Sequence, residues 1–120
     1  MKKKILIADS SAYMRGVLKE ILTRNDYEVV GDVANMEEVL EKCKTLNPDF
    51  VTLDLTMEGF DGVESIKTFK SEYPNISVIV VSALGQQSLV IETIKAGALE
   101  FLIKPFQTEM VLDVFKKVVK

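Results

Sequence analysis

The chain has 120 residues, a length that fits one domain with a hydrophobic core of its own. Apolar residues make up 48%, charged residues 28%, and the net charge is −3, which excludes the clustered basic surface of a nucleic-acid-binding protein. No apolar run approaches a membrane span, and the lone cysteine, Cys43, excludes an internal disulfide and fits a cytoplasmic protein. Because the chain has no histidine, histidine-based metal binding, general-base chemistry and phosphohistidine formation within it are also excluded.

Five short apolar runs recur along the chain, at residues 5–8, 28–33, 50–53, 76–81 and 99–103. Such runs indicate strands that are buried on both faces, as in parallel sheets. Apolar residues at helical spacing follow each run and predict five helices. The positions expected to face the core are Met14, Val17, Leu18, Ile21 and Leu22; Met36, Val39, Leu40 and Cys43; Val63, Ile66 and Phe69; Val90, Ile91 and Ile94; and Met110, Val111, Val114, Phe115 and Val118.

Local signals mark the ends of these helices. Ser10 or Ser11 can cap the first helix, and Asn35 with Glu38 three residues later resembles a capping box for the second. Gln107 or Thr108 begins the last helix, and Gly97 lies where a helix needs a left-handed residue at its C-terminus. Three X-Pro pairs stop helices or shape loops: Asn47-Pro48, Tyr73-Pro74 and Lys104-Pro105.

Strict alternation of strands and helices predicts an α/β fold with right-handed crossovers and helices on both faces of a doubly wound sheet. For five parallel strands and five helices we expect the flavodoxin-like strand order 2-1-3-4-5. We expect a single domain over residues 1–120, with no further domain after the last helix.

Polar side chains follow several of the predicted strands. Asp9 and Asp54 end the first and third strands, which neighbour each other in this fold, and Ser82 and Lys104 end the fourth and fifth. Each residue alone has an ordinary explanation as a turn or cap residue. Together they place two carboxylates, a hydroxyl and an ammonium at one edge of the sheet. This set suits an anionic group held with a divalent cation, and Mg²⁺ favours such hard oxygen ligands.

Five motifs in chain order resemble the receiver domain of bacterial response regulators. They are Asp54-Leu55-Thr56-Met57, Asp61-Gly62, Ser82-Ala83, Lys95-Ala96-Gly97-Ala98 and Lys104-Pro105-Phe106. The likeness covers essentially the whole chain. Within the family, Met14-Arg15 and the run from Ser82 to Gln87 most resemble the stand-alone chemotaxis regulators.

The resemblance implies a role for each matching residue. Asp54 would be the phosphoacceptor, Lys104 would pair with the phosphoryl group, and Ser82 would hydrogen-bond it. Asp54, Asp9 and the main-chain carbonyl of Thr56 would take part in binding Mg²⁺, with Asp9 acting through water. Phe101 would be the aromatic switch residue that moves inward when Ser82 is drawn to the phosphoryl group. The Lys104-Pro105 peptide bond would be cis.

The resemblance also implies partners and a partner face. The donor would be a histidine kinase, and the output partners would include a flagellar motor switch protein and a phosphatase. The fourth helix, fifth strand and fifth helix would form the docking face. On this face we expect Leu89 near the rim of the buried stripe, and exposed apolar area from Phe101, Leu112 and Val119. We expect no enzyme activity beyond the chemistry of the phosphoryl group, no nucleic-acid or membrane partner, and a monomer.

Two residues depart from the family pattern. Ser10 stands where the family carries an acid that binds Mg²⁺ directly, and Glu58 follows Met57 where the family favours proline. A unit charge pair at about 4 Å is worth on the order of 1–4 kcal/mol, so we expect Mg²⁺ affinity roughly ten- to a thousandfold below that of an ordinary receiver. Losing the proline should loosen the loop but keep the site.

Other interpretations start from the same residues. A receiver with a weakened metal site could act as a docking module without phosphorylation, or as a phosphate sink. A flavodoxin-type cofactor protein would need a phosphate-binding loop after the first strand, where this chain has Asp9-Ser10-Ser11-Ala12-Tyr13. A phosphohydrolase with Asp9 as nucleophile would need a second acid two residues later. We therefore favour the phosphorylated receiver.

Overall fold

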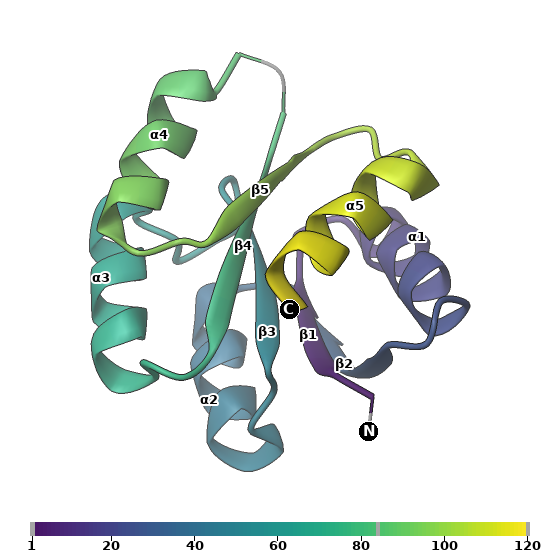
Figure 1. Cartoon of the computed structure of the whole chain (residues 1–120). Coiled ribbons are helices and arrows are strands. Elements are labelled where there is room, and N and C mark those ends of the chain that lie inside the picture. The colour runs from purple at the N-terminus through teal and green to yellow at the C-terminus, as the bar shows by residue number, and fades with distance from the viewer. Residues whose placement is uncertain (1, 84, 120) are drawn as a thin grey trace.

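The computed structural model describes residues 2–83 and 85–119, with side chains described to Val118. Five strands and five helices alternate along the chain (Figure 1). The strands are β1 (Lys4–Ala8), β2 (Glu28–Val33), β3 (Phe50–Asp54), β4 (Ser77–Ser82) and β5 (Glu100–Ile103). The helices are α1 (Ala12–Thr23), α2 (Met36–Leu46), α3 (Gly62–Glu72), α4 (Gln87–Ala96) and α5 (Thr108–Val119).

All neighbouring strands pair in parallel, in the order β2-β1-β3-β4-β5, which confirms the predicted flavodoxin-like sheet. The sheet reverses its direction of growth between β1 and β3. At such a switch point, the loops after the two strands diverge and leave room for a site at their carboxyl ends. The topology therefore brings the residues after β1 and β3 together before any side-chain contact is considered.

The two faces of the sheet bury separate hydrophobic clusters. Alternate strand residues such as Leu6, Val51 and Val80 face one cluster, which α2, α3 and α4 cover. The intervening residues, such as Ile7 and Ile79, face the other cluster, which α1 and α5 cover. Figure 1 shows α2, α3 and α4 on one side of the sheet and α1 and α5 on the other.

The capping residues predicted from the sequence are found at several of the helix ends. Ser11 caps α1 by accepting a hydrogen bond from the Met14 amide, and Asn35 caps α2 by accepting one from Glu38. The Glu38 carboxylate accepts from the amide of Ala34, one residue before the cap. Gly97 ends α4 with φ 130°, and a Cβ there would come within 3.1 Å of Lys70 Cγ, so the position favours glycine.

Helix α4 is rotated relative to the prediction. We expected Val90, Ile91 and Ile94 to face the core, but Ile91 is 55% and Ile94 37% exposed. The buried positions are Val90 and Thr93, and Leu89 is partly buried at the edge of the core, near the rim as expected. Because Thr93 is polar, the pattern of apolar residues in the sequence does not reveal that it belongs to the buried face of α4. Its hydroxyl donates to the Val90 carbonyl at 2.7 Å, so it can be buried without losing a hydrogen bond.

Helix α5 shows a smaller difference from the prediction. Val111, Val114 and Phe115 are buried as expected, but Met110 is exposed. Leu112 is half-buried, whereas the side chain of Val119 lies outside the described residues.

Among the residues of the two described ranges, no helix is both long enough and apolar enough to cross a membrane.

The Cys43 thiol predicts a pH dependence of stability. Burial raises its pKa from 9.0 to about 11, because the core does not solvate a thiolate. As the pH rises, the thiol therefore loses its proton in the unfolded chain before it does so in the folded chain. The protonated thiol contributes fully to the free energy of unfolding below about pH 9, and this contribution is lost between about pH 9 and 11. In urea titrations the free energy of unfolding should fall over that interval by about 2–3 kcal/mol more than in Cys43→Ala. Equal slopes for the two proteins would contradict this prediction.

Candidate functional site

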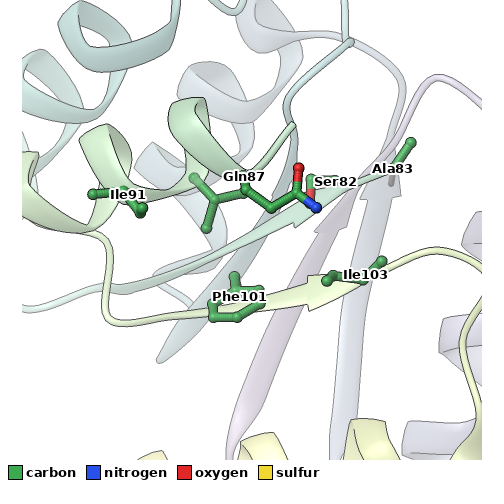
Figure 2. Close-up of a pocket in the computed structure, with 7 residues that line it drawn as sticks. Ser82, Ala83, Gln87, Ile91, Phe101 and Ile103 are labelled. Carbon is green, nitrogen blue, oxygen red and sulfur yellow. The ribbon is translucent and has the colours of Figure 1, made fainter. Parts of the chain in front are cut away.

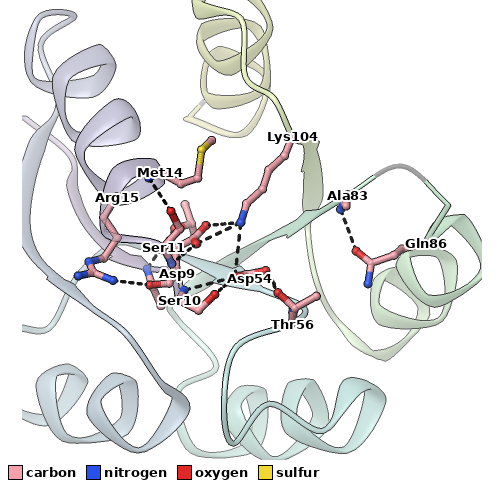
Figure 3. A network of polar contacts seen from close by, with 12 residues as sticks. Asp9, Ser10, Ser11, Met14, Arg15, Asp54, Thr56, Ala83, Gln86 and Lys104 are labelled. Carbon is pink, nitrogen blue, oxygen red and sulfur yellow. Dashed lines mark hydrogen bonds and ion pairs between the residues drawn. The ribbon is translucent and has the colours of Figure 1, made fainter.

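The four strand-end residues predicted from the sequence lie at the carboxyl edge of the sheet. Asp9 follows β1, Asp54 ends β3, Ser82 ends β4 and Lys104 follows β5. Asp9, Asp54 and Ser82 are each 1–2% exposed. The parallel register that pairs Ala8 with Leu53 sets the two aspartates side by side, and the Lys104 side chain reaches both of them (Figure 3). Three of the four side chains thus meet directly.

Donors surround the carboxylate of Asp54. Its Oδ1 accepts from the Thr56 amide at 3.1 Å and from the Thr56 hydroxyl at 3.0 Å. Its Oδ2 accepts from the Ser10 amide at 3.3 Å, from the Ser10 hydroxyl at 3.2 Å and from Lys104 Nζ at 3.5 Å. Ser10 therefore contacts Asp54 as a hydrogen-bond donor, with both its main chain and its side chain.

Asp9 is held less completely. Its Oδ1 accepts from the Ser11 amide at 2.9 Å and from Lys104 Nζ at 3.1 Å. Its Oδ2 lies 2.9 Å from Lys104 Nζ, but as an ion pair without the alignment of a hydrogen bond. Within the described ranges, this oxygen is the one buried side-chain polar atom that has no hydrogen-bond partner. Its capacity to accept hydrogen bonds is therefore not filled by the protein, and a bound cation could use it.

The two carboxyl groups titrate in opposite directions. Burial raises the pKa of Asp9 and outweighs the hydrogen bonds from Ser11 and Lys104, which lower it, while the nearby charge of Asp54 raises it a little further. Burial acts in the same sense on Asp54, but the donors of Thr56 and Ser10 and the charge of Lys104 outweigh it, so the pKa of Asp54 is lowered. Asp54 is therefore the carboxylate that the site keeps ionised, which is the form able to act as a nucleophile.

Ser82 is one of the residues that line an adjoining apolar pocket (Figure 2). This pocket, of about 230 Å³, lies between α4 and β5, and Phe101 forms part of its wall while remaining 38% exposed. The loop between β4 and α4 is closed by the Gln86 side chain, whose oxygen accepts from the Ala83 amide at 2.8 Å (Figure 3). Leu84, in the same loop, lies outside the described residues. Phe101 thus borders the pocket near Ser82 and does not touch the aspartates' hydrogen-bond network.

Sequence reasoning missed two contributors to the site. Thr56 was expected to act only through its carbonyl, but its amide and hydroxyl both hold Asp54. Arg15 had no expected role, but its Nη1 donates to the main-chain carbonyl of Asp9 at 2.7 Å. A threonine two residues after a strand-end aspartate is a recognisable signal, because short side chains bond locally in turns. Nothing in the sequence indicates that Arg15 turns back towards Asp9.

The Lys104-Pro105 bond is cis, as the resemblance implied.

The chain is a doubly wound α/β domain with two buried aspartates and a lysine at the carboxyl edge of its sheet, a combination that defines a class of protein. The family model for the response regulator receiver domain matches residues 5–116. The chain therefore belongs to the response regulator receiver family.

Similar proteins are found by both sequence and structure. The chain is 48% identical to the chemotaxis protein CheY of Thermotoga maritima, over the full length of both chains. It is 44% identical to CheY of Bacillus subtilis, over 98% of each. Among solved structures, the receiver domain of AraT, a response regulator from Geobacillus stearothermophilus, is 30% identical with a TM-score of 0.87, covering 98% of this chain and 93% of that one.

Removing the lysine tests the electrostatics of the site. Lys104→Met leaves two buried carboxylates without their shared cation, so we expect the free energy of unfolding at pH 7 to fall by about 2–4 kcal/mol. The loss should shrink towards pH 4.5, because protonated carboxyls no longer repel each other. Urea unfolding in the presence of a chelator measures both values.

Lys117→Met is the matched control for this prediction. It removes an ion pair to Glu100 in which the lysine side chain is 68% exposed, and it should cost under about 1 kcal/mol at either pH. If Lys104→Met cost no more than the control, or cost the same at both pH values, the electrostatic account would be wrong.

Proposed function

We propose that this receiver accepts a phosphoryl group on Asp54 from the phosphohistidine of a partner histidine kinase, as part of a chemotaxis-type two-component pathway. The observation that carries the proposal is the state of Asp54. It is buried at the carboxyl edge of the sheet, yet five donor contacts from Thr56, Ser10 and Lys104 favour its anion. The names of the relatives support the choice of pathway.

The transfer needs little from the protein beyond position and charge. One Asp54 oxygen attacks phosphorus, the P–N bond to the donor imidazole breaks, and the imidazole leaves with the electron pair and takes up a proton. Because the chain contains no histidine, the donor must come from another molecule. Lys104 Nζ, within 3.5 Å of both aspartates, is placed to stabilise the charge of the transferred phosphoryl oxygens.

The residues present fit a bound Mg²⁺. Mg²⁺ usually takes one or two carboxylates and fills its remaining positions with water and phosphate oxygens. Asp9 Oδ2 is the buried oxygen without a hydrogen-bond partner and would act through water, while Asp54 and the Thr56 carbonyl are the expected direct ligands. Ser10 supplies a hydroxyl in place of a third acid, and no cluster of three acidic or thiol ligands occurs within the described ranges. When bound, the ion would neutralise charge on the phosphoryl oxygens.

Output would pass through Ser82 and Phe101. A phosphoryl group on Asp54 would draw the Ser82 hydroxyl towards it and vacate space beside the apolar pocket, into which the half-exposed ring of Phe101 can turn. The partner face on α4, β5 and α5 is more apolar than the sequence indicated, because Ile91, which lines the same pocket as Phe101, is exposed, and Ile94 on the same helix is exposed too. Phosphorylation would shift an existing equilibrium between two arrangements of this face. A motor switch protein and a phosphatase are the proposed output partners.

A docking module without phosphorylation is not favoured. Such a module has no need to bury two carboxylates, since each costs free energy unless it is compensated. Here Lys104, Thr56 and Ser10 compensate Asp54 at the position where a phosphoryl group would attach. A phosphate sink uses the same chemistry and differs only in lacking an output partner.

Phosphorylation can be tested directly with a small donor. Incubation with acetyl phosphate and millimolar Mg²⁺ should add the mass of one phosphoryl group to the intact chain. Asp54→Asn should abolish the addition, whereas Asp113→Asn, which changes an exposed acid on α5, should keep it. If the native chain remained unmodified at high Mg²⁺, or if Asp54→Asn were still modified, the proposed function would be wrong.

Restoring the acid tests the proposed metal position. In Ser10→Asp the added carboxylate should tighten Mg²⁺ binding roughly ten- to a thousandfold, by the charge argument above. The metal-free form should become less stable, because three carboxylates would then share one lysine. Calorimetric titration measures the affinity, and Ser10→Ala serves as the control that removes the hydroxyl without adding charge. An unchanged affinity in Ser10→Asp would show that residue 10 does not face the metal.

A further inference from the structure

We infer that Arg15 is a positioning residue that aims the carboxylate of Asp9 into the site and thereby sets the affinity for Mg²⁺. The inference rests on the proposed function. It starts from one contact: Arg15 Nη1 donates to the main-chain carbonyl of Asp9 at 2.7 Å, and the Arg15 side chain is only 19% exposed (Figure 3). A short hydrogen bond from a charged donor is among the stronger contacts available to a main-chain carbonyl.

Four hydrogen bonds fix Asp9, and its remaining oxygen makes only an ion pair. Its amide donates to the Val33 carbonyl at 3.0 Å, its carbonyl accepts from Arg15, and its Oδ1 accepts from the Ser11 amide and from Lys104 Nζ. The remaining oxygen, Oδ2, is the buried atom without a hydrogen-bond partner. The direction of Oδ2 therefore depends on the main-chain bonds of Asp9 together with the ion pair to Lys104 Nζ at 2.9 Å.

The same contact reaches Asp54 through one planar group. The Asp9 carbonyl and the Ser10 amide belong to a single peptide unit, which rotates as a rigid plane. Arg15 holds one side of that plane, and the Ser10 amide donates to Asp54 Oδ2 from the other side at 3.3 Å. Loss of the Arg15 bond would free this plane to rotate, and both carboxylates would lose part of their alignment.

Arg15 is itself held from β2. Its Nε donates to Asp32 Oδ1 at 3.0 Å, so the guanidinium bonds one oxygen on β2 and one in the loop after β1 at once. Because Asp32 balances its charge, Arg15 acts through geometry rather than by adding positive charge near the metal. The planar guanidinium can span both oxygens, whereas a lysine ammonium is a compact point charge. Arg15→Lys should therefore recover little of the effect.

Lys19 offers a matched control on the same aspartate. Lys19 Nζ lies 4.0 Å from Asp32 Oδ2, and its ion pairs among the described residues do not include Asp9. Arg15→Met and Lys19→Met each remove one basic side chain from Asp32, but only the first removes the bond to the Asp9 carbonyl. A difference between the two variants thus reports the contact with Asp9.

Two readouts test the inference. Without metal, the Ser10 amide resonance should shift and its hydrogen exchange should accelerate in Arg15→Met but not in Lys19→Met. In calorimetric titrations, Mg²⁺ should bind roughly ten- to a hundredfold more weakly to Arg15→Met, the usual effect of losing a group that orients a metal ligand. Lys19→Met should stay within about twofold of the native chain.

The outcomes separate this inference from the proposed function. If Arg15→Met lost stability while its Ser10 amide and its Mg²⁺ affinity stayed native, Arg15 would be merely structural and the inference would be overturned. If the native chain bound no Mg²⁺ and took no phosphoryl group, the proposed function would fail. The metal-free Ser10 signal would then still decide whether Arg15 positions this peptide.

Discussion

The burial of two carboxylates beside a single ammonium is the constraint on which the rest of this site depends. Asp9 and Asp54 are both inaccessible to solvent, and such a pair is tolerated only where donors or a cation compensate the charge. Lys104 can reach both because parallel strands in the order β2-β1-β3-β4-β5 end at one edge. The remaining donors are shared unequally: Asp54 receives those of Thr56 and Ser10, and Asp9 keeps an oxygen without a hydrogen bond. The donors therefore favour the anion of Asp54 more strongly than the anion of Asp9.

Much of this arrangement follows from the sequence. Each strand is a short apolar run, and an acid or a lysine directly after such a run must lie at the sheet edge, so the positions of Asp9, Asp54 and Lys104 could be predicted. The rotation of α4 could not, because its buried stripe contains Thr93, whose hydroxyl is satisfied within the helix. The contact between Arg15 and Asp9 also escapes sequence reasoning, since it depends on the direction of one long side chain.

Under the proposed function, Ser10 would change the balance between metal binding and stability in this receiver. A carboxylate at this position would bring a third negative charge next to one lysine and would rely on a metal for compensation. The hydroxyl instead donates to Asp54, so the site is largely satisfied by its own residues. The expected result is a domain that remains stable without metal and binds Mg²⁺ weakly. In such a site, precise alignment of Asp9 matters more, which gives the bond from Arg15 its importance.

The central claim is that the site keeps Asp54 ionised while it raises the pKa of Asp9. The most direct measurement is carbon-detected NMR titration of the two side-chain carboxyl carbons in the metal-free protein, with assignments from Asp54→Asn and Asp9→Asn. The account predicts that Asp54 titrates below the ordinary range of an aspartate and that Asp9 titrates above it. The reverse order, with Asp9 losing its proton first, would contradict the account.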